Sequence, residues 1–194
     1  VIILTAIFTS IFGGVNTLWD RRYGFMNKAL TSPISRSAIA LGKMSAISLI
    51  AALQASLIIG IALAIGVTFP NPLMIIPIMG IVILFSLGFS GISVTLAATA
   101  KSQETFWGMI NLLGMPLFML SPALFPLELL PNWLAVVAKL NPVTYTVLLV
   151  RELMTGVSEG GVPILISIAV IFAFVVAMVA IASYVFTREV NKPF

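Results

Sequence analysis

Uncharged apolar stretches constrain the fold of this chain more than any other feature of its sequence. Residues 44–69, 73–100, 106–125 and 162–186 contain no charged side chain. Each stretch reaches about 20 residues or more, the length at which a helix crosses the hydrocarbon core of a bilayer. Backbone hydrogen bonds in lipid must be satisfied internally, and the alternation typical of barrel strands is absent from these stretches. The predicted fold class is therefore an all-α polytopic membrane protein.

Residues 1–17 are similarly apolar and predict part of a further span, which makes five in all. The chain begins at Val1, without an initiator methionine and without the basic segment of a signal peptide. We therefore expect it to be a fragment that lacks its natural N-terminus. The composition agrees with a membrane location, because the mean hydropathy is +1.18 and only 8% of the residues are charged.

The residue types that are missing exclude most enzyme classes. The sequence has no cysteine and no histidine, which excludes disulfides, thiol nucleophiles, histidine metal ligands and Ser-His catalysis. The Gly-Phe-Ser-Gly motif at 88–91 therefore lacks a base and is interpreted as a small-residue packing face. Lys43 follows a glycine but lacks the rest of a P-loop, and we expect it to lie at the membrane edge. The chain itself is expected to bind no ATP, metal or other cofactor.

Basic residues are distributed unequally between the two sides that alternating spans define. Lys139 and Arg151 fall on one side, and all the other lysines and arginines fall on the other. Because cytoplasmic loops are enriched in Lys and Arg, we predict that residues 18–43, the turn after residue 100 and the tail 187–194 are cytoplasmic. The chain is then expected in the inner (cytoplasmic) cell membrane, with its C-terminus in the cytoplasm.

Segment 126–161 would then lie outside the cell, and it is long for a plain loop. Its stretches 129–140 and 144–154 are apolar but shorter than a transmembrane helix. We expect two short helices that re-enter the outer leaflet, with a turn at Asn141-Pro142 between them.

The cytoplasmic segment 18–43 has the periodicity of an amphipathic helix. Its apolar side chains recur at spacings of four, three and four residues, at Trp19, Tyr23, Met26 and Leu30. Pro33 is expected to end this helix, and Ser35 to cap a new helix that runs on into the next span. Periodicity alone leaves two alternatives, a helix lying on anionic headgroups or a docking surface for a soluble partner.

Two separated motifs carry a resemblance to a known family. The segment DRRYGFMNKALTSPISRSAIALGK, from Asp20 to Lys43, resembles the cytoplasmic segment of ABC-2 type transporter permeases of the daunorubicin-resistance type. The segment FPLELLPNWLAVVAKLNPVTYTVLLVRELMTG, from Phe125 to Gly156, is similar to the external stretch of the same family. The resemblance implies a six-span permease, of which five spans are present here, that pairs with a second permease copy.

The resemblance also implies a role for the amphipathic helix, as a coupling helix seated in a groove of a separate nucleotide-binding ATPase subunit. ATP and Mg would bind on that subunit. The residues assigned to docking are Trp19, Asp20, Arg21, Arg22, Tyr23, Gly24, Met26, Leu30, Pro33 and Arg36. Gly24 is expected to permit close approach of the partner. Many family members have a Glu-rich start where this chain has Asp-Arg-Arg.

Mild polar residues inside the spans are candidates for a translocation path, namely Gln54, Ser90, Thr95 and Asn111. Such residues more commonly form hydrogen bonds between helices, and that alternative stays open. No ionisable residue is predicted at a span centre, which argues against a proton-coupled carrier. Candidates for an external gate, or alternatively for headgroup contact, are Glu128, Trp133, Asn141, Pro142, Tyr145 and Arg151.

The expected function is that of the permease subunit of an ATP-driven ABC exporter, which moves an amphipathic, drug-like or lipid-linked substrate out of the cytoplasm. Its expected partners are the ATPase subunit, a second permease copy and the lipid bilayer, with no nucleic acid. The alternatives are a membrane anchor or assembly subunit that transports nothing, and a secondary carrier driven by a proton gradient.

Overall fold

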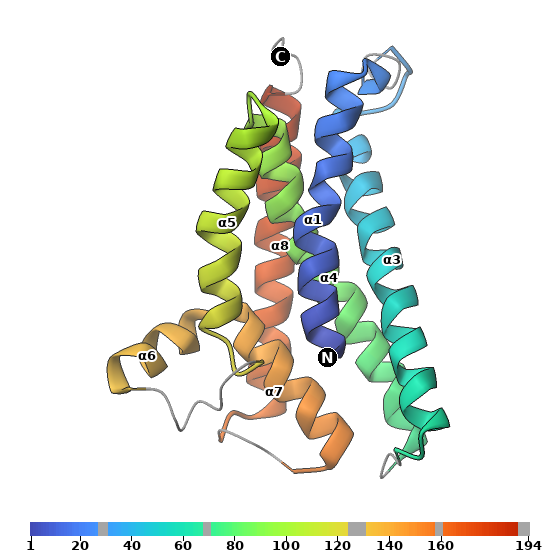
Figure 1. Cartoon of the computed structure of the whole chain (residues 1–194), viewed down its shortest axis with the longest axis vertical. Coiled ribbons are helices and arrows are strands. Elements are labelled where there is room, and N and C mark those ends of the chain that lie inside the picture. Colours follow the sequence, from blue (N-terminus) through green and yellow to red (C-terminus); the bar gives the residue numbers. More distant parts are fainter. Residues whose placement is uncertain (27–30, 68–70, 124–130, 158–160, 190–194) are drawn as a thin grey trace.

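The computed structural model describes residues 1–26, 31–67, 71–123, 131–157 and 161–189, and Figure 1 shows their arrangement. These residues form helices joined by turns, and none of them lies in a strand. Four helices within these ranges are long and apolar enough to cross a membrane: α1 (Ile2–Arg22), α3 (Arg36–Ala64), α4 (Ile75–Thr99), which follows the 3-10 turn Pro72–Met74, and α8 (Ile164–Glu189). The predicted all-α polytopic fold is confirmed.

Helix α4 lies at the centre of the bundle, with α1, α3 and α8 packed around it (Figure 1). Small residues allow the helices to approach closely. A Cβ atom added at Gly14 of α1 would lie 2.6 Å from the carbonyl oxygen of Ser93 in α4. The Ser93 hydroxyl donates to the carbonyl of Ser10 across the same contact, at 2.7 Å. The small-residue face predicted at 88–91 is likewise buried, with its glycines against α8.

Helix α3 begins where the sequence predicts, because the Ser35 hydroxyl accepts a hydrogen bond from the Ala38 amide at 3.3 Å. Its other end differs from the predicted limit at residue 69. The helix ends at Ala64, and Gly66 follows with φ +88°. This left-handed conformation stops a helix and suits glycine.

Helix α5 (Gln103–Met119) has 17 residues and differs at both ends from the predicted span 106–125. It begins earlier because the Ser102 hydroxyl accepts from the Thr105 amide at 3.1 Å. It ends earlier after Pro116, which lies in its last turn and has no amide hydrogen to donate. The predicted full-length fourth span is therefore a shorter helix in the described residues.

The two short helices predicted before the last span are present, as α6 (Asn132–Leu140) and α7 (Pro142–Thr155). Their axes meet at 83°, so the pair forms either a broken span or a re-entrant hairpin. Helix α7 begins two residues before the predicted stretch, because Asn141 Oδ1 accepts from the Val143 amide at 3.0 Å. Pro142 occupies the first helical position, where its missing amide hydrogen has no cost.

The two ends of the bundle differ in charge. The described lysines and arginines lie at the end that holds the C-terminus of α1, the start of α3 and the α4–α5 turn, with Lys139 and Arg151 as the exceptions. We call this the basic end, and the end that holds α6 and α7 the opposite end (Figure 1). Most of the described basic residues therefore lie at one end of the folded bundle. A cytoplasmic location for this basic end stays a prediction.

Candidate functional site

The predicted docking segment is not one continuous helix. Helix α1 continues past its predicted end to Arg22, and Gly24 then adopts φ +75°. A left-handed residue just after the last turn is a common helix stop, and glycine adopts it without strain. The stripe from Trp19 to Leu30 is therefore wrong as the face of a single helix. Residues 27–30 themselves lie outside the described part of the chain.

The side chains of the predicted stripe separate after this turn. Met26 is buried with Met44 and Phe186, in a cluster formed by α3, α4 and α8. Tyr23 and Phe25 are exposed, with 64% and 60% of their surface accessible. One apolar side chain therefore attaches the turn to the bundle, while two aromatic side chains face outward. The positive φ of residue 24 explains why a glycine stands there. Close approach of a partner to Gly24 stays a prediction.

Trp19 and Arg22 complete the outward surface. The Trp19 ring stacks on Tyr23 with centroids 5.3 Å apart, and the Arg22 guanidinium carbon lies 5.9 Å from the Trp19 ring centroid. Both are favourable arrangements for these groups. We call Trp19, Arg22, Tyr23 and Phe25 the aromatic turn. Pro33 is exposed in the bend that leads into α3.

Three other predicted docking residues make contacts between helices of the same chain. Asp20 forms an ion pair with Lys43 of α3. The Arg21 guanidinium donates to two carbonyls in the last turn of α4, at 2.9 and 2.7 Å. Arg36 donates to the Thr187 carbonyl of α8 at 3.4 Å. These contacts therefore join α1, α3, α4 and α8 to one another at the basic end. Whether the same residues also contact a partner stays a prediction.

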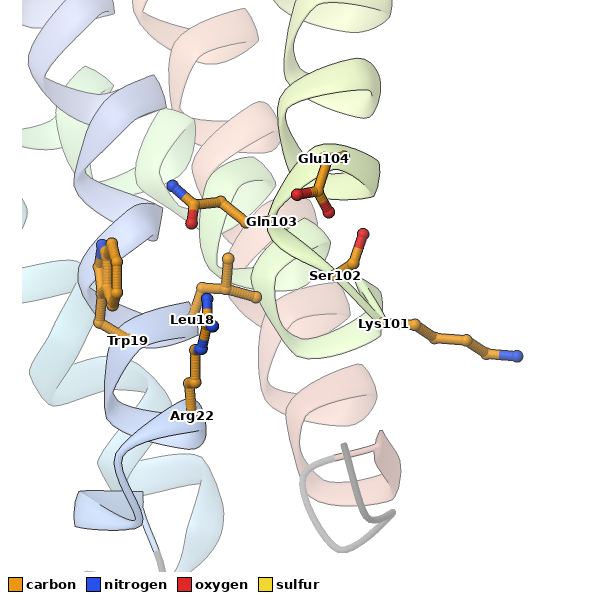
Figure 2. Close-up of a pocket in the computed structure, with 7 residues that line it drawn as sticks. All are labelled: Leu18, Trp19, Arg22, Lys101, Ser102, Gln103 and Glu104. Atoms are coloured by element: carbon orange, nitrogen blue, oxygen red, sulfur yellow. The ribbon is translucent and has the colours of Figure 1, made fainter.

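A cavity of about 300 Å³ lies beside the aromatic turn, between the end of α1 and the α4–α5 turn. Figure 2 shows its lining residues, which are Leu18, Trp19, Arg22, Lys101, Ser102, Gln103 and Glu104. Trp19 and Arg22 enter from α1, whereas the Lys101 side chain points away (Figure 2). The pKa of Glu104, which precedes the apolar part of α5, lies below its ordinary value because its carboxylate accepts hydrogen bonds from its own amide and from Ser102.

The sequence prediction of the docking residues omitted this turn at 101–104. The available signal was its charge, because the basic residues already assigned Lys101 to the same side as segment 18–43. That signal gives a side of the membrane but no distance. The structure brings the two segments together around one cavity, so the candidate site includes both.

The predicted translocation-path residues divide into two groups. Gln54 of α3 accepts a hydrogen bond from the Thr9 hydroxyl of α1. Ser90 and Thr95 donate to carbonyls of their own helix, three and four residues earlier, at 2.8 and 2.7 Å. Gln54 therefore makes a hydrogen bond between helices, as the alternative interpretation expects, and Ser90 also donates to the Met44 carbonyl of α3 at 3.4 Å. The bond described for Thr95 lies within its own helix. Asn111 is exposed, at a groove between α1 and α5 that otherwise has apolar walls, among them Phe8, Phe12 and Phe118.

The predicted gate residues that the structure describes lie at the opposite end, where Asn141 and Tyr145 hold the α6–α7 corner. The Asn141 amide group donates to a carbonyl in the last turn of α5 at 2.6 Å, and the Tyr145 hydroxyl donates to one in the last turn of α6 at 2.7 Å. Arg151 donates to the Pro122 carbonyl at 2.8 Å. Trp133 is exposed. Glu128 lies outside the described residues.

These features define a class of protein, an α-helical membrane protein with several spans. At one end of the bundle, where an ion pair joins the helices, the protein presents a surface of aromatic and arginine side chains. The ABC-2 type transporter family model matches residues 1–155, and the chain belongs to this family. The chain is 30% identical over 152 residues to a protein of Cyanophora paradoxa named "Putative transport permease ycf38", covering 76% of this chain and 52% of that protein. A protein of the same name from Pyropia yezoensis is 31% identical over 159 residues, with coverages of 78% and 54%.

The chain therefore spans about half the length of the curated relatives it matches. The family assignment made from the two sequence motifs is confirmed.

Proposed function

We propose that this chain is the membrane-spanning permease subunit of an ATP-driven exporter, and that its aromatic turn docks a separate ATPase subunit on the cytoplasmic side. The observation that carries the proposal is the aromatic turn. Its exposed aromatic and arginine groups are of the kind that contributes most to protein interfaces. The same turn is attached to the bundle by Met26 and by the Asp20–Lys43 ion pair. A displacement imposed by a partner would therefore reach the spans.

The energy for transport comes, in this proposal, from ATP and Mg bound to the partner. The chain contributes docking and a path, and a second permease copy completes the path. Closure of the paired ATPase subunits displaces the aromatic turns, and the helices tilt as rigid bodies. Membership of the ABC-2 family supports this arrangement.

The groove between α1 and α5 supports the proposed cargo class. Asn111 supplies one neutral amide among aromatic and aliphatic walls. Such a lining suits a molecule with a large apolar part and few polar groups. We therefore propose an amphipathic, drug-like or lipid-linked substrate, moved outward from the cytoplasm.

The docking proposal is tested with the permease reconstituted in nanodiscs and mixed with a candidate partner ATPase. The double variant Tyr23→Ala/Phe25→Ala removes the outward aromatic rings, and we expect ATPase affinity to fall about tenfold or more. Tyr184→Ala is the matched control, because Tyr184 is a similarly exposed ring in the last turns of α8. Unchanged affinity in the double variant would show that the aromatic turn is not the docking surface.

One observation favours a second function, that of a membrane anchor. Stacked Trp19 and Tyr23 beside Arg22 also suit the headgroup region of an anionic bilayer. In that case the double variant would change the depth of the turn in anionic liposomes. Neither the parent permease nor any variant would bind the ATPase. Transport that follows a proton gradient without ATP would instead support a secondary carrier.

A further inference from the structure

Two consecutive arginines at the end of α1 have different surroundings. Arg22 is exposed and belongs to the aromatic turn, whereas Arg21 points into the basic end. Its Nη1 atom lies 2.9, 2.7 and 3.4 Å from the carbonyl oxygens of Ala97, Ala98 and Ala100. The resemblance assigned both arginines to docking, but only Arg22 faces outward.

These three carbonyls belong to the C-terminal end of α4. The last carbonyls of a helix have no amide partner within it, and they carry the negative end of the helix dipole. A guanidinium provides both hydrogen-bond donors and a positive charge there. Arg21 of α1 is therefore a C-terminal cap for α4, supplied by a helix far away in the sequence.

The capped end of α4 is also the start of α5. Ala100 ends α4, and Ser102 already caps α5 through the Thr105 amide. A connection this short transmits movement of one helix end to the next. By binding these carbonyls, Arg21 thus positions the end of α4 and the start of α5 at the basic end.

The neighbouring residue joins the same turn of α1 to a third helix. Asp20 pairs with Lys43, which lies in the early part of α3 beyond the aromatic turn. Adjacent residues of α1 therefore contact α3 on one side and the α4–α5 turn on the other.

We propose that Arg21 is a positioning residue, which carries a displacement of the aromatic turn into α4 and α5. Because of this contact, α1, α3 and the α4–α5 turn move as one body at the basic end. The inference rests on the proposed function, since the displacement it transmits is that imposed by the ATPase. It assigns Arg21 to coupling within the permease and leaves contact with the ATPase to the aromatic turn.

The structural part of the proposal is tested without the ATPase. The sequence has no cysteine, so spin labels can be placed at Phe25→Cys and Lys101→Cys, on either side of the Arg21 contact. Pulsed dipolar spectroscopy in nanodiscs is expected to give one narrow distance distribution for the parent. Arg21→Ala should broaden it, Arg21→Lys should restore it in part, and Arg188→Ala should leave it unchanged. Arg188 is an exposed arginine of the same end that bonds only to Tyr184 among the contacts described for it.

The functional part uses the same variants with the partner ATPase. In Arg21→Ala we expect unchanged ATPase affinity and a fall of about tenfold in cargo moved per ATP hydrolysed, a size typical of lost coupling between sites. Arg22→Ala should instead weaken ATPase binding. If Arg21→Ala is not monodisperse, Arg21→Gln replaces it, and the same broadening is expected.

Two results would overturn the inference. One is a parent-like distance distribution in both Arg21→Ala and Arg21→Gln, and the other is a loss of ATPase affinity in Arg21→Ala that equals the loss in Arg22→Ala. A parent permease that binds no ATPase refutes the proposed function instead. The label distances are independent of that failure, because they are measured in the permease alone.

Discussion

The basic end and the opposite end satisfy the same chemical need in different ways. At both ends, side chains donate to carbonyls at the C-terminal end of a helix. At the basic end the donor is Arg21, and its acceptors on α4 lie more than 70 residues away in the sequence. At the opposite end Thr144 and Tyr145 donate to carbonyls only six residues earlier, at 2.6 and 2.7 Å.

The difference concerns which parts of the molecule can move together. Contacts between distant helices make the basic end one mechanical unit. At the opposite end the contacts between α6 and α7 are local, while α7 itself packs into the bundle through Val143 and Val147 in the main core and Leu149 against α8. We infer that the long-range contacts of the basic end suit an input surface.

The largest expected effect concerns the sides of the membrane on which the two ends lie. Because the chain lacks cysteine, the single variants Lys101→Cys and Val157→Cys report the basic and the opposite end. In intact cells a membrane-impermeant maleimide should label only the cysteine at position 157. Permeabilised cells should show labelling of both. Labelling of position 101 alone in intact cells would reverse the orientation and contradict the export direction.

The next prediction concerns the close contact between α1 and α4, which a larger side chain at Gly14 should disrupt. In Gly14→Leu the added side chain would collide with the Ser93 backbone. We expect a loss of about 3 kcal/mol in unfolding free energy, the upper part of the range for overpacking. Gly60→Leu on α3 is the control, since nothing lies within 4 Å of a Cβ added there. Thermal unfolding in detergent measures both, and equal stability of the two variants would refute the close crossing.

A smaller effect is expected from Asn141→Ala at the opposite end. This change removes the cap of α7 and the hydrogen bond to α5, and it should cost about 2 kcal/mol. Asn71→Ala removes only a cap, that of the 3-10 turn, and should cost less. ATPase affinity should stay at the parent value in both variants. A change in affinity for Asn141→Ala would show that the two ends are coupled more tightly than their contacts indicate.

The smallest effect is that of the Asp20–Lys43 ion pair. Its side chains are partly exposed, so Asp20→Asn should cost about 1 kcal/mol or less. The exchanged pair Asp20→Lys/Lys43→Asp should recover the stability of the parent. Thermal unfolding at low and high salt distinguishes a true pair from a general charge effect. Failure of the exchange to recover stability would remove this contact from the joined basic end.

Local rules predicted the features that depend on neighbouring residues. The apolar stretches gave the transmembrane helices, Ser35 gave the start of α3, and Asn141-Pro142 gave the corner between α6 and α7. In the last two cases the deciding contact spans at most three residues, and in the first the signal is a continuous apolar stretch. Such contacts are readable from a single sequence.

Features that depend on distant residues were not predictable in this way. The periodicity of Trp19, Tyr23, Met26 and Leu30 is that of a continuous helix, and a glycine within a helical pattern does not by itself predict a stop. The positive φ of Gly24 decides the outcome. Nothing near Arg21 in the sequence indicates that the end of α4 lies beside it. The separate roles of Arg21 and Arg22 become visible only in three dimensions.

The contact between Gly14 and Ser93 has a mechanical consequence. Backbone meets backbone there, so α1 cannot slide easily past α4. With a rise of about 1.5 Å per residue, α1 extends about 12 Å from Gly14 to Arg22 and about 18 Å from Gly14 back to Ile2. Because Arg21 also binds the end of α4, the two helices are held together at two levels and tilt together. A tilt of this body about the level of Gly14 would displace the N-terminal end of α1 about one and a half times as far as the aromatic turn, in the opposite direction.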